Sequence, residues 1–360
     1  MKAATAFIDQ KALQHNLALI KSKAPKSRVL AVIKANAYGH GVTQVARNFE
    51  GADAFGVARV EEAVKLRESG IEKPILLLEG FYSASELPVL SKYNLETVVY
   101  NLEQLDAIEQ SDLQSPLKVW LKIDTGMHRL GIDPESLPLY LERISNSSKI
   151  QKPINYISHF ACADELDSPF TSSQIKCFLN TIEGLEGERS IAASAGILKW
   201  SESHMEWNRP GIILYGISPF DSVNAKELGF KPVMTLKSKI ISVKRVKRGE
   251  SVGYGAAWTT ERDTTVAVIA IGYGDGYPRT APHGTPVWIN GRRVPVAGRV
   301  SMDMLTVDLG PEAQDKVGDE AIFWGNELPV EEVAKHVGTI GYELVTRLTS
   351  RVELAYVPTD

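Results

Sequence analysis

The stretch VLAVIKANAYGHG, residues 29–41, holds the pattern that decides the fold and poses the first functional question. Its first five residues, Val29 to Ile33, are apolar and predict a buried strand. Lys34 follows at once, and Gly39 and Gly41 lie in the small-residue turn behind it. A buried strand that ends on an ammonium group beside small residues indicates a place where the backbone comes close to a ligand.

Seven further short apolar runs follow this one up to about residue 220, and segments of helical period such as VEEAVKLRESG separate them. This alternation is typical of parallel strands joined by helices. Eight strand–helix units predict an α/β fold with a (β/α)8, TIM-like barrel, and a doubly wound sheet is the weaker alternative. The runs are VLAVI (from Val29), AFGVA (Ala54), PILLL (Pro74), TVVY (Thr97), KVWLKI (Lys118), INYISHF (Ile154), SIAAS (Ser190) and GIILYG (Gly211).

After Phe220 the pattern changes to strands joined by short turns, with one helix candidate, PVEEVAKHVG. The segment NGRR from Asn290 is a hairpin signal of the Asn-Gly kind. We therefore expect two domains, an α/β barrel over residues 1–225 and a mostly antiparallel β domain over residues 226–360. The strands expected in the second domain are MTLKSKIISVKRV, TTVAVIAIGYG, TPVWINGRRVPVAG, MLTVDLG, EAIFWG and RLTSRVELAYV.

Composition excludes several classes of protein. With 44% hydrophobic residues, 23% charged residues and a net charge of −4, the chain reads as an ordinary globular protein without a nucleic-acid partner. Its two cysteines, Cys162 and Cys177, form no Cys-x-x-Cys pair, so we expect neither a disulfide framework nor a metal site. Asp9 and Gln10 lie where a signal peptide would need its apolar region, and no apolar run approaches a membrane span. We expect a cytoplasmic protein without a membrane partner.

Active sites of such barrels gather at the C-terminal ends of the strands, so polar residues close behind the apolar runs are candidates. Each one alone has a plain alternative, because a lysine after a strand is usually a solvated end and a lone histidine is usually structural. Together they indicate one active site at the strand ends. The candidates are Lys34, Lys122, Arg129, His159, Ser194 and Arg209.

Lys34 has the sharpest functional interpretation. Desolvation at a dry barrel rim disfavours the ammonium form, and a neutral amine attacks aldehydes to form a Schiff base. Tyr38 offers a phenol, and Ser194 to Gly196 with Gly211 and Ile212 suggest a phosphate site near the last two strands. An aldehyde-binding lysine with a phosphate site indicates pyridoxal phosphate, although class I aldolases and phosphate-binding isomerases combine the same features.

The chain closely resembles the alanine racemase family, pyridoxal-phosphate enzymes of the α/β-barrel class. The resemblance covers nearly the whole length, and its motifs occur in order. They are AVIKANAYGHG, KIDTGMHRLG (122–131), SHFACAD (158–164), NRPGIILYG (208–216), VGYGAAW (252–258), GYGDGYPR (272–279), GRVSMDM (298–304) and GYELVTRL (341–348).

The resemblance implies a racemase that interconverts L-alanine and D-alanine and supplies D-alanine for peptidoglycan. Lys34 would bind the cofactor covalently and act as the base on one face. Tyr254 matches the opposing tyrosine, which a partner chain contributes, so the site would be complete only in a homodimer. Inversion at the α-carbon requires two acid–base groups on opposite faces of one plane.

The resemblance also implies the remaining contacts. Arg209 matches the arginine at the pyridine nitrogen, and His159 would link it towards Tyr254. Arg129 and the Met302 amide match contacts to the substrate carboxylate. Lys122 matches a position that is carbamylated in several members, and Ser301 departs from members with a cysteine there. The residues that match phosphate ligands are Tyr38, Ser194, Gly211, Ile212 and Tyr342.

Two alternatives remain at this point. A decarboxylase of basic amino acids uses the same barrel, cofactor and lysine, but those enzymes place an acidic residue where this chain has Arg209 and use a cysteine in the C-terminal domain. A non-catalytic cofactor-binding barrel would not need the second domain that carries Tyr254.

Overall fold

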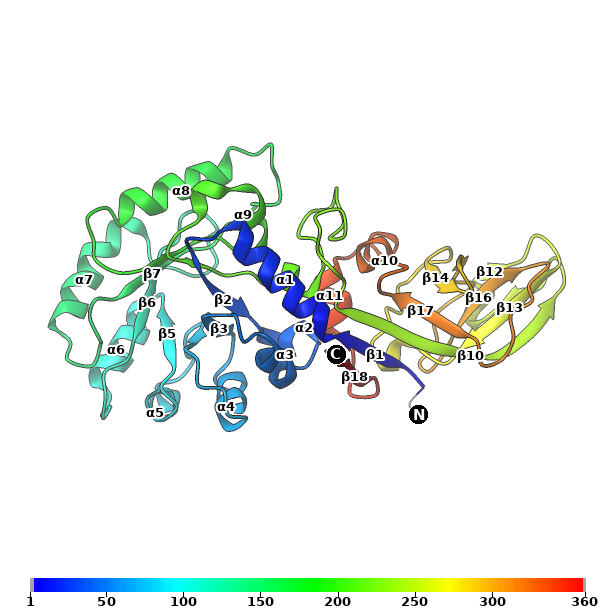
Figure 1. Ribbon diagram of the computed structural model, residues 1–360, viewed down its shortest axis with the longest axis horizontal. Coiled ribbons are helices and arrows are strands. Elements are labelled where there is room, and N and C mark those ends of the chain that lie inside the picture. The colour runs from blue at the N-terminus through cyan, green and yellow to red at the C-terminus, as the bar shows by residue number, and fades with distance from the viewer. Residues whose placement is uncertain (1–2, 359–360) are drawn as a thin grey trace. The chain divides into compact units, whose positions relative to one another are not determined.

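The computed structural model describes residues 3–358 and divides into two compact units (Figure 1). The barrel unit comprises residues 16–37 and 41–214, and the β unit comprises the remaining described residues. The division falls inside helix α1 (Gln10–Lys23) and near the end of the short element α2 (Lys34–Tyr38). Within residues 3–358, no helix is both long enough and apolar enough to span a membrane.

The barrel unit contains eight parallel strands in the order β8-β7-β6-β5-β4-β3-β2-β9. The two end strands approach each other, because the Arg209 amide donates to the Ala192 carbonyl at 2.9 Å and Ser190 Oγ donates to the Trp207 carbonyl at 2.8 Å. The structure therefore confirms the predicted barrel, which is nearly closed. Its strands are β2 (Arg28–Val32), β3 (Ala54–Val57), β4 (Ile75–Leu77), β5 (Glu96–Val99), β6 (Val119–Lys122), β7 (Asn155–Ile157), β8 (Arg189–Ser190) and β9 (Trp207–Asn208).

Helices between the strands pack their apolar faces inward. In α4, for example, Val60, Ala63 and Leu66 are buried, as the spacing of the apolar residues predicts. Gly70, just past this helix, takes the positive φ of 88° that is typical of a helix C-terminus. The helices are α3 (Val42–Asn48), α4 (Val60–Glu68), α5 (Leu87–Lys92), α6 (Leu102–Gln110), α7 (Leu137–Asn146), α8 (Phe170–Thr181) and α9 (Ser194–Lys199).

The prediction for the eighth strand was wrong in position. GIILYG does not form a strand but the 3-10 turn η4 (Ile212–Tyr215), and the eighth strand is β9 just before it. Pro210 lacks an N–H and cannot continue a strand ladder. Ile212, Ile213 and Leu214 are nevertheless buried, so the apolar run reflects a buried turn, which hydrophobicity alone does not distinguish from a strand.

The β unit is built on the long strand β10, and its strands mostly pair antiparallel, as the sequence predicts. The β14–β15 hairpin turns at Asn290 and Gly291, whose φ values of 44° and 82° are those of the expected Asn-Gly turn. Two short strands, β11 (Ser251–Val252) and β12 (Trp258–Thr259), form a separate ribbon. The main-sheet strands are β1 (Thr5–Asp9), β10 (Met234–Val246), β13 (Thr264–Ile269), β14 (Pro286–Ile289), β15 (Arg292–Pro295), β16 (Leu305–Gly310), β17 (Glu320–Trp324) and β18 (Glu353–Val357), and the helices are α10 (Val330–Val337) and α11 (Gly341–Thr346).

Strand β1 is the main topological finding that the sequence analysis missed. It lies between β10, which it pairs antiparallel, and β18, which it pairs parallel. Residues that the sequence analysis assigned to the barrel domain thus belong to the sheet of the β unit. Ile8 faces Met234 on one side and Tyr356 on the other, and its side chain is fully buried.

We expect Ile8→Ala to destabilise the protein by about 2–5 kcal/mol, because it leaves a cavity beneath three strands of the sheet. Urea unfolding followed by circular dichroism measures the loss. Thr5→Ala, at a half-buried position of the same strand, should cost about 0.5 kcal/mol or less. Equal stability of the Ile8 variant and the wild type would contradict the placement of β1 inside this sheet.

Candidate functional site

The carboxyl ends of the barrel strands bring the predicted polar residues to one rim. Lys34 follows β2, Lys122 ends β6, His159 follows β7 and Arg209 follows β9 directly. Because parallel strands end on the same side of a barrel, these residues share one end of the barrel unit. The hydrogen bond from Arg209 to His159 Nδ1, at 3.3 Å, agrees with that placement.

Arg209 is buried and anchored at the ends of β7 and β8. It donates to Ser190 Oγ at 2.6 Å, to the Ser158 carbonyl at 2.6 Å and to His159 Nδ1 at 3.3 Å. Burial lowers the pKa of the Arg209 guanidinium to about 9, which still leaves it charged at neutral pH. Burial together with the neighbouring charges of Arg209 and Lys122 holds the pKa of His159 well below its usual value, so the imidazole is neutral and its Nδ1 accepts.

Lys122 is a buried cation among other cations. Only 8% of its surface is exposed. Burial, followed by the charges of Arg209 and Arg129, lowers the pKa of Lys122 to about 8, while the carboxylate of Glu79 acts in the opposite direction. The rim is therefore rich in positive charge that the protein compensates only in part.

Arg129 is exposed on the loop after β6, and Asp124 organises that loop. Asp124 Oδ1 accepts from the amides of Gly126 at 2.9 Å and His128 at 3.1 Å, and its Oδ2 contacts His128 Nδ1 at 3.1 Å. These bonds outweigh the effect of partial burial and lower the pKa of Asp124. The loop that carries Arg129 is thus tied to the end of the strand.

Lys34 begins a left-handed turn. Ala35, Asn36 and Ala37 have φ values of 51°, 55° and 55°, and Tyr38 continues with 51°. This conformation costs roughly 1–2 kcal/mol for each L-residue with a Cβ, although asparagine tolerates it better than alanine. Such strain persists only where the surrounding structure enforces it and is typical of functional sites.

Glu79 is a rim residue that the sequence analysis missed. Its Oε1 lies 3.6 Å from Lys34 Nζ, and Tyr82 donates to its Oε2 at 2.8 Å. Partial burial acts to raise the pKa of Glu79, but the Tyr82 hydrogen bond and the charges of Lys34 and Arg59 outweigh it, and the net shift is downward. Glu79 follows the apolar run PILLL, so the search for polar residues at strand ends could have found it.

The residues predicted to bind phosphate fall into two groups, one in each unit. In the barrel unit, Ser194 Oγ accepts from the amides of Gly211 at 3.0 Å and Ile213 at 3.4 Å, and Ile212 is buried beside them. Serine oxygen that accepts twice still carries a hydroxyl proton that it can donate.

In the β unit, the Tyr38 ring lies 4.9 Å from that of Tyr215 and 6.2 Å from that of Tyr342, measured between centroids. Burial raises the pKa of Tyr38, so its phenol stays protonated and can donate. Gly39 lets the chain approach the backbone of α11 closely, because a Cβ there would lie 2.0 Å from the Val345 carbonyl oxygen.

Tyr254 and Met302 also belong to the β unit. Tyr254 lies in the turn between β11 and β12 and is 71% exposed, and Met302 is 52% exposed. The Met302 carbonyl accepts from the Gly274 amide at 2.8 Å, and the Ser301 carbonyl accepts from Tyr273, so this loop is pinned to its neighbour.

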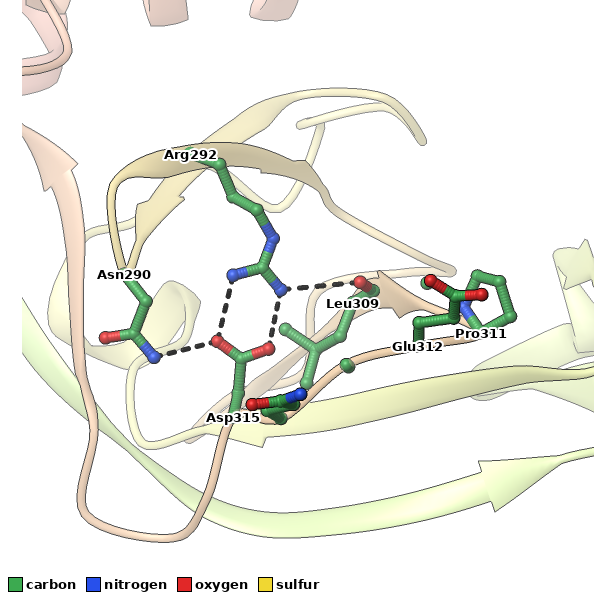
Figure 2. A pocket seen from close by; sticks show the side chains of 9 residues that line it. Asn290, Arg292, Leu309, Pro311, Glu312 and Asp315 are labelled. Carbon is green, nitrogen blue, oxygen red and sulfur yellow. Dashed lines mark hydrogen bonds and ion pairs between the residues drawn. The ribbon is translucent and has the colours of Figure 1, made fainter.

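A surface pocket of about 450 Å³ lies elsewhere in the β unit, near Arg292 and Asp315 (Figure 2). Arg292 pairs with Asp315 through contacts of 3.0 and 2.5 Å, and Asn290 donates to the same carboxylate at 2.9 Å. These polar groups satisfy one another, so we interpret them as a structural ion pair rather than a binding site. No predicted site residue lines the pocket.

The low pKa of Lys122 predicts a pH dependence of stability. Its folded pKa of about 8 lies below the unfolded value of 10.5, so between these values the unfolded chain binds more protons and stability rises with pH. From pH 7 to pH 10, the wild type should gain about 2 kcal/mol relative to Lys122→Met. Urea unfolding of the cofactor-free chains in buffer free of carbon dioxide measures this difference. Parallel pH profiles of the two proteins would show that Lys122 is not buried as a cation.

Comparison with known proteins places this geometry in context. The sequence matches the family model "Alanine racemase, N-terminal domain" over residues 8–219 and "Alanine racemase, C-terminal domain" over residues 233–356. The alanine racemase of Vibrio cholerae serotype O1 is 64% identical over 356 residues, which cover 99% of each chain, and that of Aeromonas hydrophila is 57% identical over 357 residues.

Solved structures give the same result. The crystal structure of biosynthetic alanine racemase from Pseudomonas aeruginosa matches with a TM-score of 0.96 and 46% identity, over 99% of this chain and 100% of that one. Alanine racemase from Acinetobacter baumannii matches with a TM-score of 0.91 and 40% identity, with the same coverage.

Proposed function

The chain belongs to the alanine racemase family, and from this premise we propose that it interconverts L-alanine and D-alanine with pyridoxal phosphate, using Lys34 and Tyr254 as the two acid–base groups. The observation that carries the proposal is the buried, anchored guanidinium of Arg209 at the rim that also presents Lys34. The decarboxylase alternative has no comparable support, because the family match runs through both halves of the chain.

The donor set at the rim fits an anionic cofactor. Arg209, Arg129 and Lys34 all act to lower the pKa of Lys122, which shows that the cations crowd one another. A group with a phosphate and an ionised phenol would relieve this repulsion. The residues that would hold the phosphate are Tyr38, Ser194, Gly211, Ile212 and Tyr342.

Pyridoxal phosphate, when bound, supplies an aldehyde carbon that takes up amines and a conjugated ring that delocalises the electron pair left at the α-carbon. Lys34 would hold the cofactor and exchange a proton with one face of the α-carbon. Tyr254 of a partner chain would exchange a proton with the other face, which makes the homodimer the active form.

Arg209 would limit how far the electron pair is delocalised. A guanidinium donates a hydrogen bond but does not give up its proton, so Arg209 would leave a ring nitrogen beside it unprotonated, unlike a carboxylate partner. This would favour prompt return of a proton to the α-carbon. His159 supports Arg209 as a neutral acceptor.

We propose further that the substrate carboxylate is bound by Arg129 and by the Met302 amide of the partner chain, and that the enzyme works in the cytoplasm and supplies D-alanine for peptidoglycan. The match to an enzyme described as biosynthetic in Pseudomonas aeruginosa supports this role.

Chiral chromatography of L-alanine incubated with the protein and pyridoxal phosphate tests the proposal. We expect an even mixture of enantiomers, because mirror images have equal free energy in water. Lys34→Ala should abolish conversion, and Tyr254→Phe should slow it about 10²- to 10⁴-fold while the visible absorbance of the cofactor stays. Unchanged alanine beside an intact absorbance would overturn the proposal, and release of carbon dioxide would identify a decarboxylase.

Lys122 is proposed to carry a carbamate in the working enzyme. With a pKa of about 8, roughly a tenth of its side chains are neutral at pH 7 and can attack carbon dioxide. The amine nitrogen would form a bond to the carbon of carbon dioxide and release one proton to solvent, and the resulting anion would pair with Arg129. In NMR spectra of protein equilibrated with ¹³C-bicarbonate, we expect a carbamate signal that Lys122→Met removes. A spectrum without that signal in the wild type would refute the modification.

A further inference from the structure

Glu62, in the first turn of α4, connects two segments of the barrel rim through its carboxylate. Oε1 accepts from the amide of Ala35 at 2.6 Å, and Oε2 accepts from the amides of Ala58 at 2.9 Å and Arg59 at 3.1 Å. The first amide directly follows Lys34, and the other two follow β3. Hydrogen bonds from N–H groups to a carboxylate are about twice as strong as neutral ones.

The segment that Oε1 holds is the strained left-handed turn. Packing cannot enforce this conformation at Ala35, because that residue is exposed. Further along the turn, the packing of the buried residues Ala37 and Tyr38 and several hydrogen bonds, among them the bond from the Ala37 amide to the Ile33 carbonyl at 2.9 Å, hold the backbone. Asn36 Oδ1 accepts from the Val42 amide at 3.0 Å, and the Asn36 carbonyl accepts from Gly41 at 2.9 Å. The two Asn36 bonds connect Asn36 to residues 41 and 42, on its C-terminal side. The Glu62 bond holds the peptide group that joins Lys34 to Ala35.

We propose that Glu62 is a positioning residue for Lys34, whose carboxylate holds the left-handed turn and so fixes the direction of the lysine side chain. This inference rests on the proposed function of Lys34. Without Glu62, Ala35 would relax towards ordinary φ values, because a left-handed alanine is strained. The backbone at Lys34 would turn with it. A displacement of about 1 Å in a catalytic group costs on the order of 10²-fold in rate.

A plain alternative is that Glu62 only caps α4, since it accepts from Arg59 at the start of that helix. The two roles use different oxygens of one carboxylate. Capping involves Oε2 alone, so a capping role predicts lost stability with no effect on residues 34–38. The positioning role predicts effects on this turn even where stability is little changed.

The first experiment measures hydrogen exchange by mass spectrometry in cofactor-free, full-length protein. Glu62→Ala should speed exchange in the peptide that contains the Ala35 amide about tenfold or more. The second records circular dichroism of the bound cofactor in its visible band, which reports how the cofactor is oriented. This signal should change in Glu62→Ala, and kcat should fall about 10- to 100-fold with a smaller change in KM.

A rescue separates positioning from capping. Glycine adopts left-handed φ values as readily as ordinary ones, so Ala35→Gly removes the strain that Glu62 opposes. In the Glu62→Ala background, Ala35→Gly should raise kcat several-fold and restore part of the dichroism signal. A change at residue 35 does not restore a lost helix cap. Should Glu62→Ala fold poorly, Glu62→Met is the second variant, because it keeps the length of the side chain and has no oxygen to accept from the Ala35 amide.

Asn101→Ala is the matched control, because Asn101 Oδ1 caps α6 by accepting from the Gln104 amide at 2.9 Å. It should lower Tm comparably while kcat and the dichroism stay within twofold of the wild type. Unchanged exchange and dichroism in the Glu62 variants, or no rescue by glycine, would overturn the inference. A wild type that binds the cofactor but leaves alanine unchanged would instead overturn the proposed function. The exchange experiment would still test whether Glu62 holds the left-handed turn.

Discussion

The site depends on one constraint, the confinement of positive charge at the end of the barrel. Arg209 is buried and held by Ser190 and Ser158, and its position cannot adjust without breaking the contacts that bring β8 and β9 together. Lys122 is buried close by, and its pKa is lowered first by burial and then by the charges of Arg209 and Arg129. Burying several cations together costs stability, and the anionic cofactor proposed for this site would offset that cost.

A second cost lies in the backbone at Lys34. Ala35 and Ala37 adopt left-handed φ values at a cost in free energy, whereas glycine would adopt the same values without strain. Glycine would, however, leave the turn free to move. Alanine combined with the Glu62 and Asn36 hydrogen bonds restricts the turn, and the covalent cofactor anchor proposed for Lys34 would benefit from that rigidity.

Much of the fold could be predicted from the sequence. The first six barrel runs overlap the strands β2 to β7, because short apolar segments between amphipathic helices have few other solutions, whereas SIAAS contributes only Ser190 to β8. Asn290 and Gly291 form the expected turn because their preference for positive φ is local. Strand β1 escaped prediction for the opposite reason, since nothing within residues 5–9 indicates that the partners lie at 234–237 and 353–357.

The candidate site was predictable to a similar degree. Strand-end polarity led to Lys34, Lys122, His159 and Arg209, which lie at or just behind strand ends, and the same rule overlooked Glu79. The catalytic and binding roles of these residues stay predictions. Glu62 carries no such signal, because a glutamate in the first turn of a helix is ordinary and its contact with Ala35 exists only in three dimensions. The roles of Tyr254, Met302 and Tyr342 remain predictions, as do the cofactor and the homodimer.

The central claim is that Lys34 is the covalent anchor of the cofactor. Reduction of the pyridoxal-phosphate-loaded protein with borohydride fixes the carbon–nitrogen double bond as a stable amine, and peptide mass spectrometry then locates the added mass. The account predicts that the mass lies on the peptide containing Lys34 and in near-stoichiometric amount. Its presence on the peptide containing Lys122, or spread over surface lysines, would contradict the account.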